Sequence, residues 1–347
     1  MKNPDIKRIL PAEWYPQSAV QLAWPHPQSD WRTIIDEVIE CYVEIIRQIA
    51  LRQRVFVVCP KASQVIPYFK NCNLKNISFF EILTNDTWAR DFGGITILEN
   101  GHPVVCDFQF NGWGLKFIAD LDNRVTAELF RKGAFAKEVG CRDYLDFVLE
   151  GGSIESDGKG TLLTTEHCLL SKNRNDSRNK EELEQFLKNT LGIEQVLWLD
   201  HGALEGDDTD SHIDTLARFC DEKTIAYVKC EDPEDIHFEE LARMEKELRL
   251  FRTKEGHPYN LLPLPMADPV FDEKDGHQLP ATYANFLIIN EAVLVPFYNS
   301  PKDEEAGAIL QIAFPDREII GVNCLPLIKQ HGSLHCITMQ YPQGTIL

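Results

Sequence analysis

The chain has 347 residues, of which 44% are hydrophobic and 26% charged, so it is too apolar for a disordered protein and long enough for one large domain or two ordinary ones. It contains 54 Asp and Glu residues against 35 Lys and Arg residues, a net charge of −19. This balance disfavours nucleic acid and anionic membranes as partners and favours a cationic small molecule.

Neither the start of the chain nor its hydropathy predicts a secreted or membrane-spanning protein. Residues 1–8 carry charges with no apolar stretch after them, and no run of eighteen apolar residues occurs anywhere in the sequence. The ten cysteines form no close pair that resembles a zinc knuckle, and most lie in apolar segments. We therefore expect a cytoplasmic protein whose cysteines are reduced.

The first eighty residues predict a strand, a helix and two further strands. Residues 19–24 and 54–59 are apolar enough for buried strands. Between them, apolar side chains from Trp31 to Ile49 recur on one helical face. A short helix and a strand at 77–83 follow.

From residue 94 onward, the order hairpin, helix, strand occurs four times. The first hairpin turns at Asn100-Gly101, a pair suited to the positive φ angles of tight turns. The last helix opens with Ser300-Pro301-Lys302-Asp303, which predicts a cap residue, a first-turn proline and a capping-box acid. The predicted hairpins start at 94, 153, 213 and 285; the helices lie near 120–139, from 180, near 237–253 and from 300; and further strands lie at 196–200, 318–323 and 334–340.

None of these ββαβ-like units can bury its own apolar face, so they need one another as neighbours. Their regular spacing predicts radial packing in a single α/β domain that spans residues 1–347. The first strands and the last strand would complete a fifth unit.

Polar residues gather in the segments just before the predicted hairpins and just before the last strand. Equivalent positions in a radial array converge on its axis, so residues far apart in sequence could line one pocket. These polar segments are 85–91, 150–152, 207–214 and 331–336.

Cys336 and His212 are the residues in these segments that could carry chemistry together. A cysteine and a histidine permit thiolate attack with proton transfer, although each could instead be a structural residue. Asp214 lies two residues after His212, which on an extended strand would place both side chains on one face. Zinc is the competing use of such residues, but a catalytic zinc site needs about three protein ligands, and the histidines do not cluster with ligand spacing.

The other polar segments also have plain structural interpretations. Arg90-Asp91 could form a surface ion pair, and Asn85-Asp86 could be turn residues. Glu150-Gly151-Gly152 could be a turn between strands, since glycine permits tight backbone geometry. The acidic run 207–210 could be a solvated loop.

In its motifs the chain resembles the agmatine deiminases, within the peptidylarginine-deiminase-type branch of the guanidino-modifying superfamily. The resemblance spans nearly the whole chain, and it implies a five-bladed α/β propeller with pseudo-fivefold symmetry and an active site on the axis. The motifs that carry it are LPAEW at 10–14, AWP at 23–25, NDTWARD at 85–91, EGGSI at 150–154, LSKNRN at 170–175, DTDSHID at 208–214 and HCITMQ at 335–340.

The resemblance also implies catalytic roles. Cys336 would be the nucleophile and His212 the general acid and base. Asp91 and Asp214 would bind the guanidinium group, and Glu150 would support the site or orient His212.

Further residues would bind the substrate without taking part in the chemistry. Trp88 would form a wall of the pocket, and the acidic loop with Glu205, Asp207 and Asp208 would bind a distal amine. Family members commonly have glycine before the histidine, where this chain has Ser211.

The implied reaction is hydrolysis of agmatine to N-carbamoylputrescine and ammonia through a covalent cysteine intermediate, without a metal or an organic cofactor. Three alternatives remain open: a deiminase of peptidyl-arginine or another guanidino compound, an enzyme that transfers the amidino group to an amine, and a noncatalytic polyamine-binding protein. The sequence leaves homo-oligomerisation open.

Overall fold

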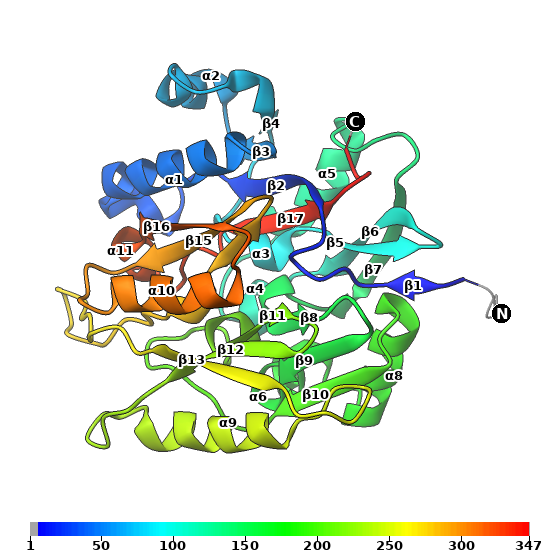
Figure 1. Ribbon diagram of the computed structural model, residues 1–347. Helices are drawn as coiled ribbons and strands as arrows, with labels where there is room; N and C mark the ends of the chain where they lie inside the picture. Colours follow the sequence, from blue (N-terminus) through cyan, green and yellow to red (C-terminus); the bar gives the residue numbers. More distant parts are fainter. Residues whose placement is uncertain (1–5, 347) are drawn as a thin grey trace.

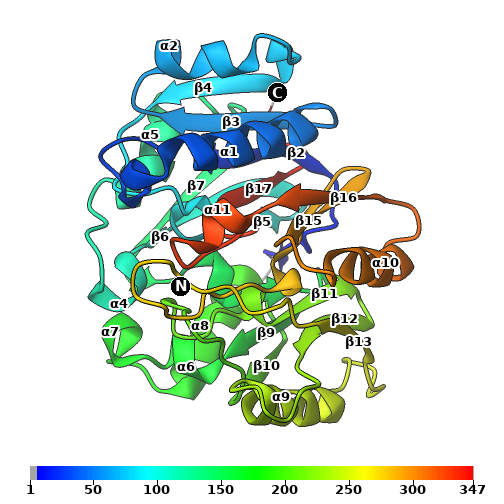
Figure 2. The same ribbon diagram turned by 90° about the vertical axis from the view of Figure 1, so that its left-hand side faces the viewer.

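Five β-sheets with helices between them make up the part of the chain that the computed structural model describes, residues 6–346 (Figures 1 and 2). In each sheet an antiparallel pair of strands is extended by a parallel strand. The fold is therefore a mixed α/β fold with several sheets. Within residues 6–346, no helix has the length and apolar character needed to cross a membrane.

The four predicted hairpins are confirmed, and each is continued by a parallel strand after a helical crossover. β1 (Arg8–Ile9) adds a fourth strand to the first of these sheets, beside β5. The four sheets contain β5 (Ile95–Glu99), β6 (His102–Gln109) and β7 (Gly140–Val148); β8 (Ile154–Ser156), β9 (Thr161–Thr165) and β10 (Gln195–Leu199); β11 (Ala217–Asp221), β12 (Thr224–Lys229) and β13 (Asn260–Pro265); and β14 (Leu287–Ile289), β15 (Ala292–Phe297) and β16 (Glu318–Asn323).

The fifth sheet joins the two ends of the chain, as the sequence predicts. β17 (Thr338–Pro342) pairs antiparallel with β2 (Gln17–Ala23), and β3 (Arg54–Cys59) and β4 (Ile77–Glu81) follow in parallel. The last strand begins at Thr338 and not near 334, because the residues before it form a turn.

The longer helices bury one apolar face each, and Figures 1 and 2 show α9 and α10 at the periphery. In α8, Asn179 and Glu182 form a reciprocal capping box, and Gly192 with φ +77° ends the helix. The helices are α1 (Ile35–Ala50), α2 (Ala62–Val65), α3 (Ala89–Phe92), α4 (Gly112–Leu115), α5 (Val125–Arg131), α6 (Glu166–Leu169), α7 (Lys172–Asn175), α8 (Lys180–Leu191), α9 (Phe238–Leu250), α10 (Asp303–Ala313) and α11 (Leu325–Ile328).

Two predicted helix boundaries are wrong. The helix expected near 120–139 is only the seven residues of α5, because Gly133 adopts φ +71° and ends the helical path. The last long helix starts at Asp303 and not at Ser300. The Asp303 carboxylate still accepts a hydrogen bond from the Ser300 N–H, at 3.2 Å, so the acid caps the turn from inside the helix.

Short helical turns precede the hairpins and contact one another in series. They are α3 and the 3-10 turns Gly151–Ser153, Ile213–Thr215 and Tyr283–Asn285. The turn before β17 closes the series, since the Cys336 carbonyl accepts a hydrogen bond from the Arg90 N–H at 3.1 Å. The polar segments that the sequence predicts to converge therefore lie together.

Candidate functional site

The meeting point of these turns borders an open cavity. Cys336 lies in its wall, and the cavity carries both aromatic surface and a concentration of carboxylates. The aromatic residues are Trp88, Trp113 and Phe117, and the acidic residues are Asp30, Asp86, Asp91 and Asp208. An apolar wall with several carboxylates suits an elongated cation.

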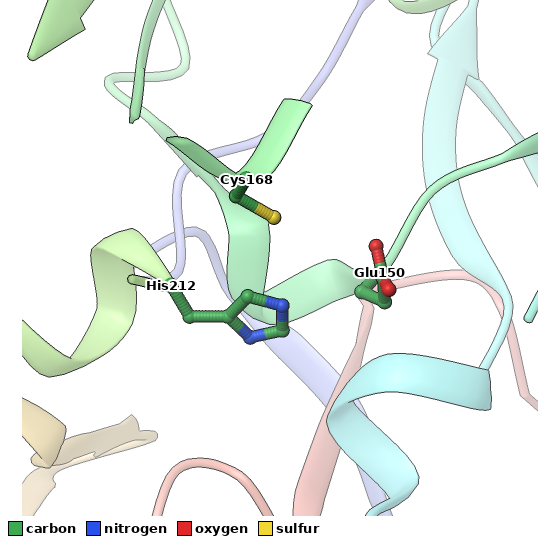
Figure 3. A group of neighbouring side chains, drawn as sticks. All are labelled: Glu150, Cys168 and His212. Atoms are coloured by element: carbon green, nitrogen blue, oxygen red, sulfur yellow. The ribbon is translucent and has the colours of Figure 1, made fainter. Parts of the chain in front are cut away.

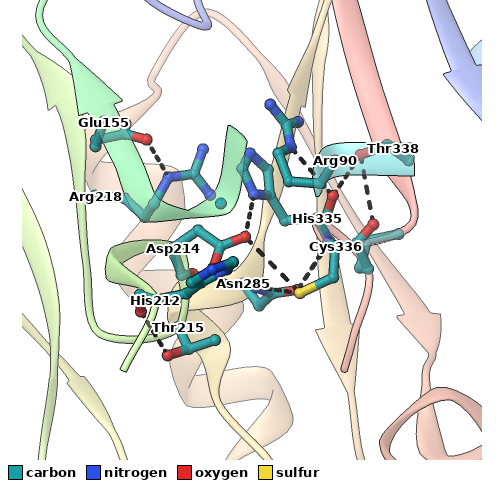
Figure 4. Close-up of polar contacts among 12 residues, drawn as sticks. Arg90, Glu155, His212, Asp214, Thr215, Arg218, Asn285, His335, Cys336 and Thr338 are labelled. Atoms are coloured by element: carbon teal, nitrogen blue, oxygen red, sulfur yellow. Dashed lines mark hydrogen bonds and ion pairs between the residues drawn. The ribbon is translucent and has the colours of Figure 1, made fainter. Parts of the chain in front are cut away.

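Cys336 sits in the turn before β17, where Asn285 holds it from the side (Figure 4). The Asn285 Oδ1 accepts the N–H of His335 at 2.8 Å, and its Nδ2 lies 3.3 Å from the Cys336 Sγ. The thiol is buried, and this burial together with the Asp214 and Asp91 carboxylates raises its pKa well above the usual value. A cation that enters the cavity would oppose this effect and favour the thiolate.

His212 is the N-cap residue of the turn Ile213–Thr215, so the expectation that it lies on an extended strand is wrong. Within residues 6–346, neither ring nitrogen has a hydrogen-bond partner, and Nδ1 lies 3.6 Å from the Asp91 Oδ1. Burial lowers the pKa of His212, but nearby Asp91 and Cys168 outweigh it and raise the pKa to about 10. At neutral pH the ring is an imidazolium with a proton to give.

Asp91 projects from α3 and is held on both oxygens. The Gly152 N–H donates to Oδ1 at 3.0 Å, and the Trp113 indole N–H donates to Oδ2 at 2.9 Å. Burial raises the pKa of Asp91 to about 6. Gly152 is needed here for space, because a Cβ atom would stand 2.5 Å from the His212 Nδ1.

Asp214 lies near Asp91 and keeps one oxygen free. Its Oδ2 accepts a hydrogen bond from the His335 Nδ1 at 2.7 Å and lies 3.8 Å from the Cys336 Sγ. Among the described residues, its buried Oδ1 has no partner. Burial favours the neutral acid, but the hydrogen bond from His335 outweighs it, so the pKa of Asp214 is lowered. An ionised carboxylate with a free acceptor therefore stands beside the cysteine.

Glu150 lies near Cys168 and His212 (Figure 3) and forms a buried ion pair with Arg174. The Arg174 Nε donates to both Glu150 oxygens, at 2.9 and 3.0 Å. Ligand atoms of Glu150, Cys168 and His212, all of types that zinc can bind, lie within 4.8 Å of one another. Because Arg174 already neutralises the carboxylate, the group fits a charged hydrogen-bonding cluster better than a metal site.

Of the three acidic-loop residues considered for a distal amine, only Asp208 lines this cavity. The Asp207 carboxylate turns into its own loop, where it accepts the N–H groups of Thr209 and Ser211 at 3.1 and 2.7 Å. Glu205 borders a different hollow.

The structure adds residues to the site that sequence reasoning missed. Asp30 and Asp86 line the cavity, and burial raises the pKa of Asp86 to about 7. Asn285, which contacts the Cys336 thiol, lies in the short turn before the fourth hairpin. Its position in the repeat is the sequence signal that could have identified it. His335 stood beside Cys336 in the sequence, but its partners could not be inferred from spacing.

Comparisons with known proteins agree along the length of the chain. The profile of the family described as Porphyromonas-type peptidyl-arginine deiminase matches residues 9–342. A protein named agmatine deiminase from Ectopseudomonas mendocina is 33% identical, over 96% of this chain and 95% of its own.

Two solved structures are similar as well. The agmatine deiminase of C. jejuni, in a Cys-to-Ser variant with substrate bound, is 41% identical with a TM-score of 0.91, covering 100% of this chain and 99% of its own. A protein from Porphyromonas gingivalis, described as a candidate arginine deiminase, is 53% identical with a TM-score of 0.94, covering 98% of this chain and 100% of its own.

Proposed function

The chain belongs to the Porphyromonas-type peptidyl-arginine deiminase family, and on this premise we propose that it hydrolyses agmatine to N-carbamoylputrescine and ammonia. One observation carries the proposal. The thiol of Cys336 lies 3.8 Å from the buried Asp214 carboxylate and lines the same cavity as the buried Asp91 carboxylate, and one Asp214 oxygen has no protein partner among the described residues. Such an arrangement suits a planar cation whose carbon is to be attacked.

The fold that goes with this proposal is a five-bladed α/β propeller in one domain. Five sheets with the same antiparallel-then-parallel order support it, as does the closed series of turns that precedes their hairpins. In a propeller these turns surround the axis, which is where the cavity lies.

Binding of the guanidinium group depends on Asp91 and Asp214. A guanidinium presents planar N–H donors that match carboxylate oxygens. Each close ion pair gains about 4 kcal/mol of gross Coulomb energy at an effective dielectric of about 20, before desolvation is subtracted. The bound cation also offsets the two carboxylates that raise the thiol pKa, so substrate binding favours the reactive thiolate at Cys336.

The chemistry then passes between Cys336 and His212. The thiolate adds to the guanidinium carbon, and His212 protonates the nitrogen that leaves as ammonia. A thiouronium-like intermediate remains on the sulfur. His212, now neutral, takes a proton from water, and the hydroxide displaces the sulfur to give the ureido product.

The rest of the cavity favours a substrate with a second positive charge. Asp208, Asp30 and Asp86 line it together with the Trp88 wall. We assign the distal ammonium to this acidic side, with Asp208 as its principal partner. Free arginine or a peptidyl-arginine, suggested by the family name and by the P. gingivalis relative, would carry a carboxylate or a peptide chain into the same negative surroundings.

The test is to incubate the purified protein with agmatine and measure ammonia and N-carbamoylputrescine together. The proposed reaction releases them in equal amounts. Loss of agmatine without ammonia, in the presence of an acceptor amine, would mean transfer of the amidino group. Binding without either product would mean a polyamine-binding protein.

A further inference from the structure

His335, the residue before the nucleophile, has a carboxylate against each nitrogen of its ring. Its Nδ1 lies 2.7 Å from the Asp214 Oδ2 (Figure 4), and its Nε2 lies 2.6 Å from the Glu13 Oε2. All three side chains are buried. A chain of close contacts thus leads from the cavity to Glu13, which is 322 residues away from His335 in sequence.

The number of protons in this chain follows from the chemistry of imidazole. A neutral ring has one N–H and one lone pair, so it can donate to only one of its two neighbours. The other contact would press a lone pair against a carboxylate oxygen. Either the ring carries two protons, or one carboxyl group carries the second.

Glu13 is not the group that carries it. Its Oε1 accepts the Ile288 N–H at 2.6 Å, and its Oε2 accepts the Arg218 Nη2 at 2.9 Å in addition to His335. Burial favours the neutral acid, but Arg218 and His335 outweigh it and lower the pKa of Glu13 far below its usual range. The second proton therefore belongs to His335 or to Asp214.

The charges that face His335 come from four directions. Burial and the guanidinium groups of Arg218 and Arg90 lower the pKa of His335 and outweigh Glu13 and Asp214, which raise it. The geometry opposes this balance, because both ring nitrogens lie within 2.7 Å of a carboxylate oxygen and a neutral ring can donate to only one of them. The thiol of Cys336 follows it in the chain. Which group holds the proton decides whether Asp214 is ionised when substrate arrives, because Asp214 can bind a guanidinium well only as a carboxylate.

We propose that Glu13 keeps His335 doubly protonated, and that His335 in turn keeps Asp214 ionised, oriented and with Oδ1 free for the guanidinium. Glu13 and His335 do not line the catalytic cavity, so they are positioning residues. The inference rests on the proposed function, because it explains how that function's guanidinium site is prepared.

The direct test is the protonation state of His335 in the substrate-free protein, measured by nitrogen NMR on histidine-labelled full-length chain. The His335 signals are identified by their loss in His335→Asn. Two protonated nitrogens are expected at pH 7.5, and a neutral ring at this pH would overturn the proposal. No substrate is used, so this result is independent of whether the protein turns over agmatine.

A second test uses Glu13→Gln, which keeps the size and removes the charge. The glutamine amide can donate to Nε2, so the ring becomes neutral with its N–H toward Asp214. Burial is the main cause that raises the pKa of the equally buried Asp91 to about 6, and the pKa of Asp214 should rise in the same way once the imidazolium is gone. Because Asp91 already titrates in this range, the acid limb of kcat/KM for agmatine should become steeper in Glu13→Gln, with two carboxylates losing protons instead of one, and should move to higher pH.

Glu155→Gln is the matched control. Glu155 is buried and accepts a hydrogen bond from Arg218 at 2.8 Å, as Glu13 does, but it does not contact His335. In Glu155→Gln, the acid limb of kcat/KM for agmatine should be the same as in the parent protein. Equal shifts of the acid limb in the two variants would show that the contact of Glu13 with His335 does not control the ionisation of Asp214. An unchanged acid limb in Glu13→Gln, together with a singly protonated His335 ring, would show the same. Should Glu13→Gln fail to fold, the NMR measurement on the parent protein still decides.

Discussion

The two histidines beside Cys336 are equally buried but held in opposite ways. Among the described residues, neither ring nitrogen of His212 has a hydrogen-bond partner, whereas both nitrogens of His335 lie within 2.7 Å of a carboxylate oxygen. A proton carrier needs a nitrogen that is free to meet the substrate, and a positioning residue needs both nitrogens fixed. The site therefore has a His212 side that transfers protons and a His335 side whose side chains are held in a fixed orientation.

The same division applies to the two aspartates. Asp91, on the His212 side, has each oxygen hydrogen-bonded, and burial raises its pKa to about 6. Asp214, on the His335 side, has one free oxygen and a lowered pKa. The two carboxylates of one cation site thus have different pKa values, because only Asp214 is hydrogen-bonded to a buried histidine.

Replacing Cys336 should have the largest effect, since the two sides of the site act through it. Cys336→Ala should lower kcat for agmatine more than about 10⁴-fold, because the covalent route is lost. Calorimetry should show agmatine affinity within a few-fold of the parent, since the carboxylates remain. Cys141→Ala, at an exposed cysteine, is the control. Near-normal product formation in Cys336→Ala would move the nucleophile to another cysteine.

His212→Gln should lower kcat by about 10²- to 10⁴-fold with little change in KM, because a proton donor to the leaving ammonia is lost. Steady-state kinetics against His201→Gln, a histidine that is paired with Glu247 and does not line the cavity, measures the effect. If His335→Gln lowered kcat in this way and His212→Gln did not, the roles of the two histidines would be reversed.

Asp91→Asn should reduce kcat/KM about tenfold to hundredfold, since a charge-assisted contact is worth about 1.5 to 3 kcal/mol. The amide places N–H groups toward the guanidinium donors, and Asp214 alone would hold the carbon less well for attack, so kcat should fall too. A folded Asp91→Asn protein with unchanged kcat and KM would show that Asp91 does not touch the guanidinium.

The smallest effect concerns the loop that carries His212. Ser211 adopts φ +65°, a left-handed conformation that favours glycine. Ser211→Gly should therefore raise the free energy of unfolding by about 0.5 to 1 kcal/mol. Urea titration measures it, and a clear loss of stability would mean that the serine side chain contributes more than the backbone strain costs.

The features that sequence reasoning predicted well are those set by neighbouring residues. The Asn100-Gly101 turn has φ angles of +50° and +84°, as its residue types indicate. The predicted helix near 120–139 failed because distant contacts decide that region. The Asp122 carboxylate accepts the N–H groups of Asn85 and Asp86, and Asn123 accepts that of Phe110, so the residues before α5 form only a 3-10 turn, Asp122–Arg124, that is tied to other segments.

In the site, the motif residues came together, but their partners were beyond prediction. Cys336, His212, Asp91 and Asp214 meet at one cavity or beside it. The contacts of His335 with Glu13 and of Asn285 with Cys336 join residues 322 and 51 positions apart, and a single sequence does not reveal such pairs.

The measurement that tests the central claim most directly is the ratio of kcat/KM for agmatine to that for free arginine. The acidic side of the cavity should attract the agmatine ammonium and repel the arginine carboxylate, so agmatine should be favoured by about a hundredfold or more. Asp208→Asn, which removes one of these charges, should lower the ratio. A ratio near one in the parent protein would contradict the assignment of agmatine as the substrate.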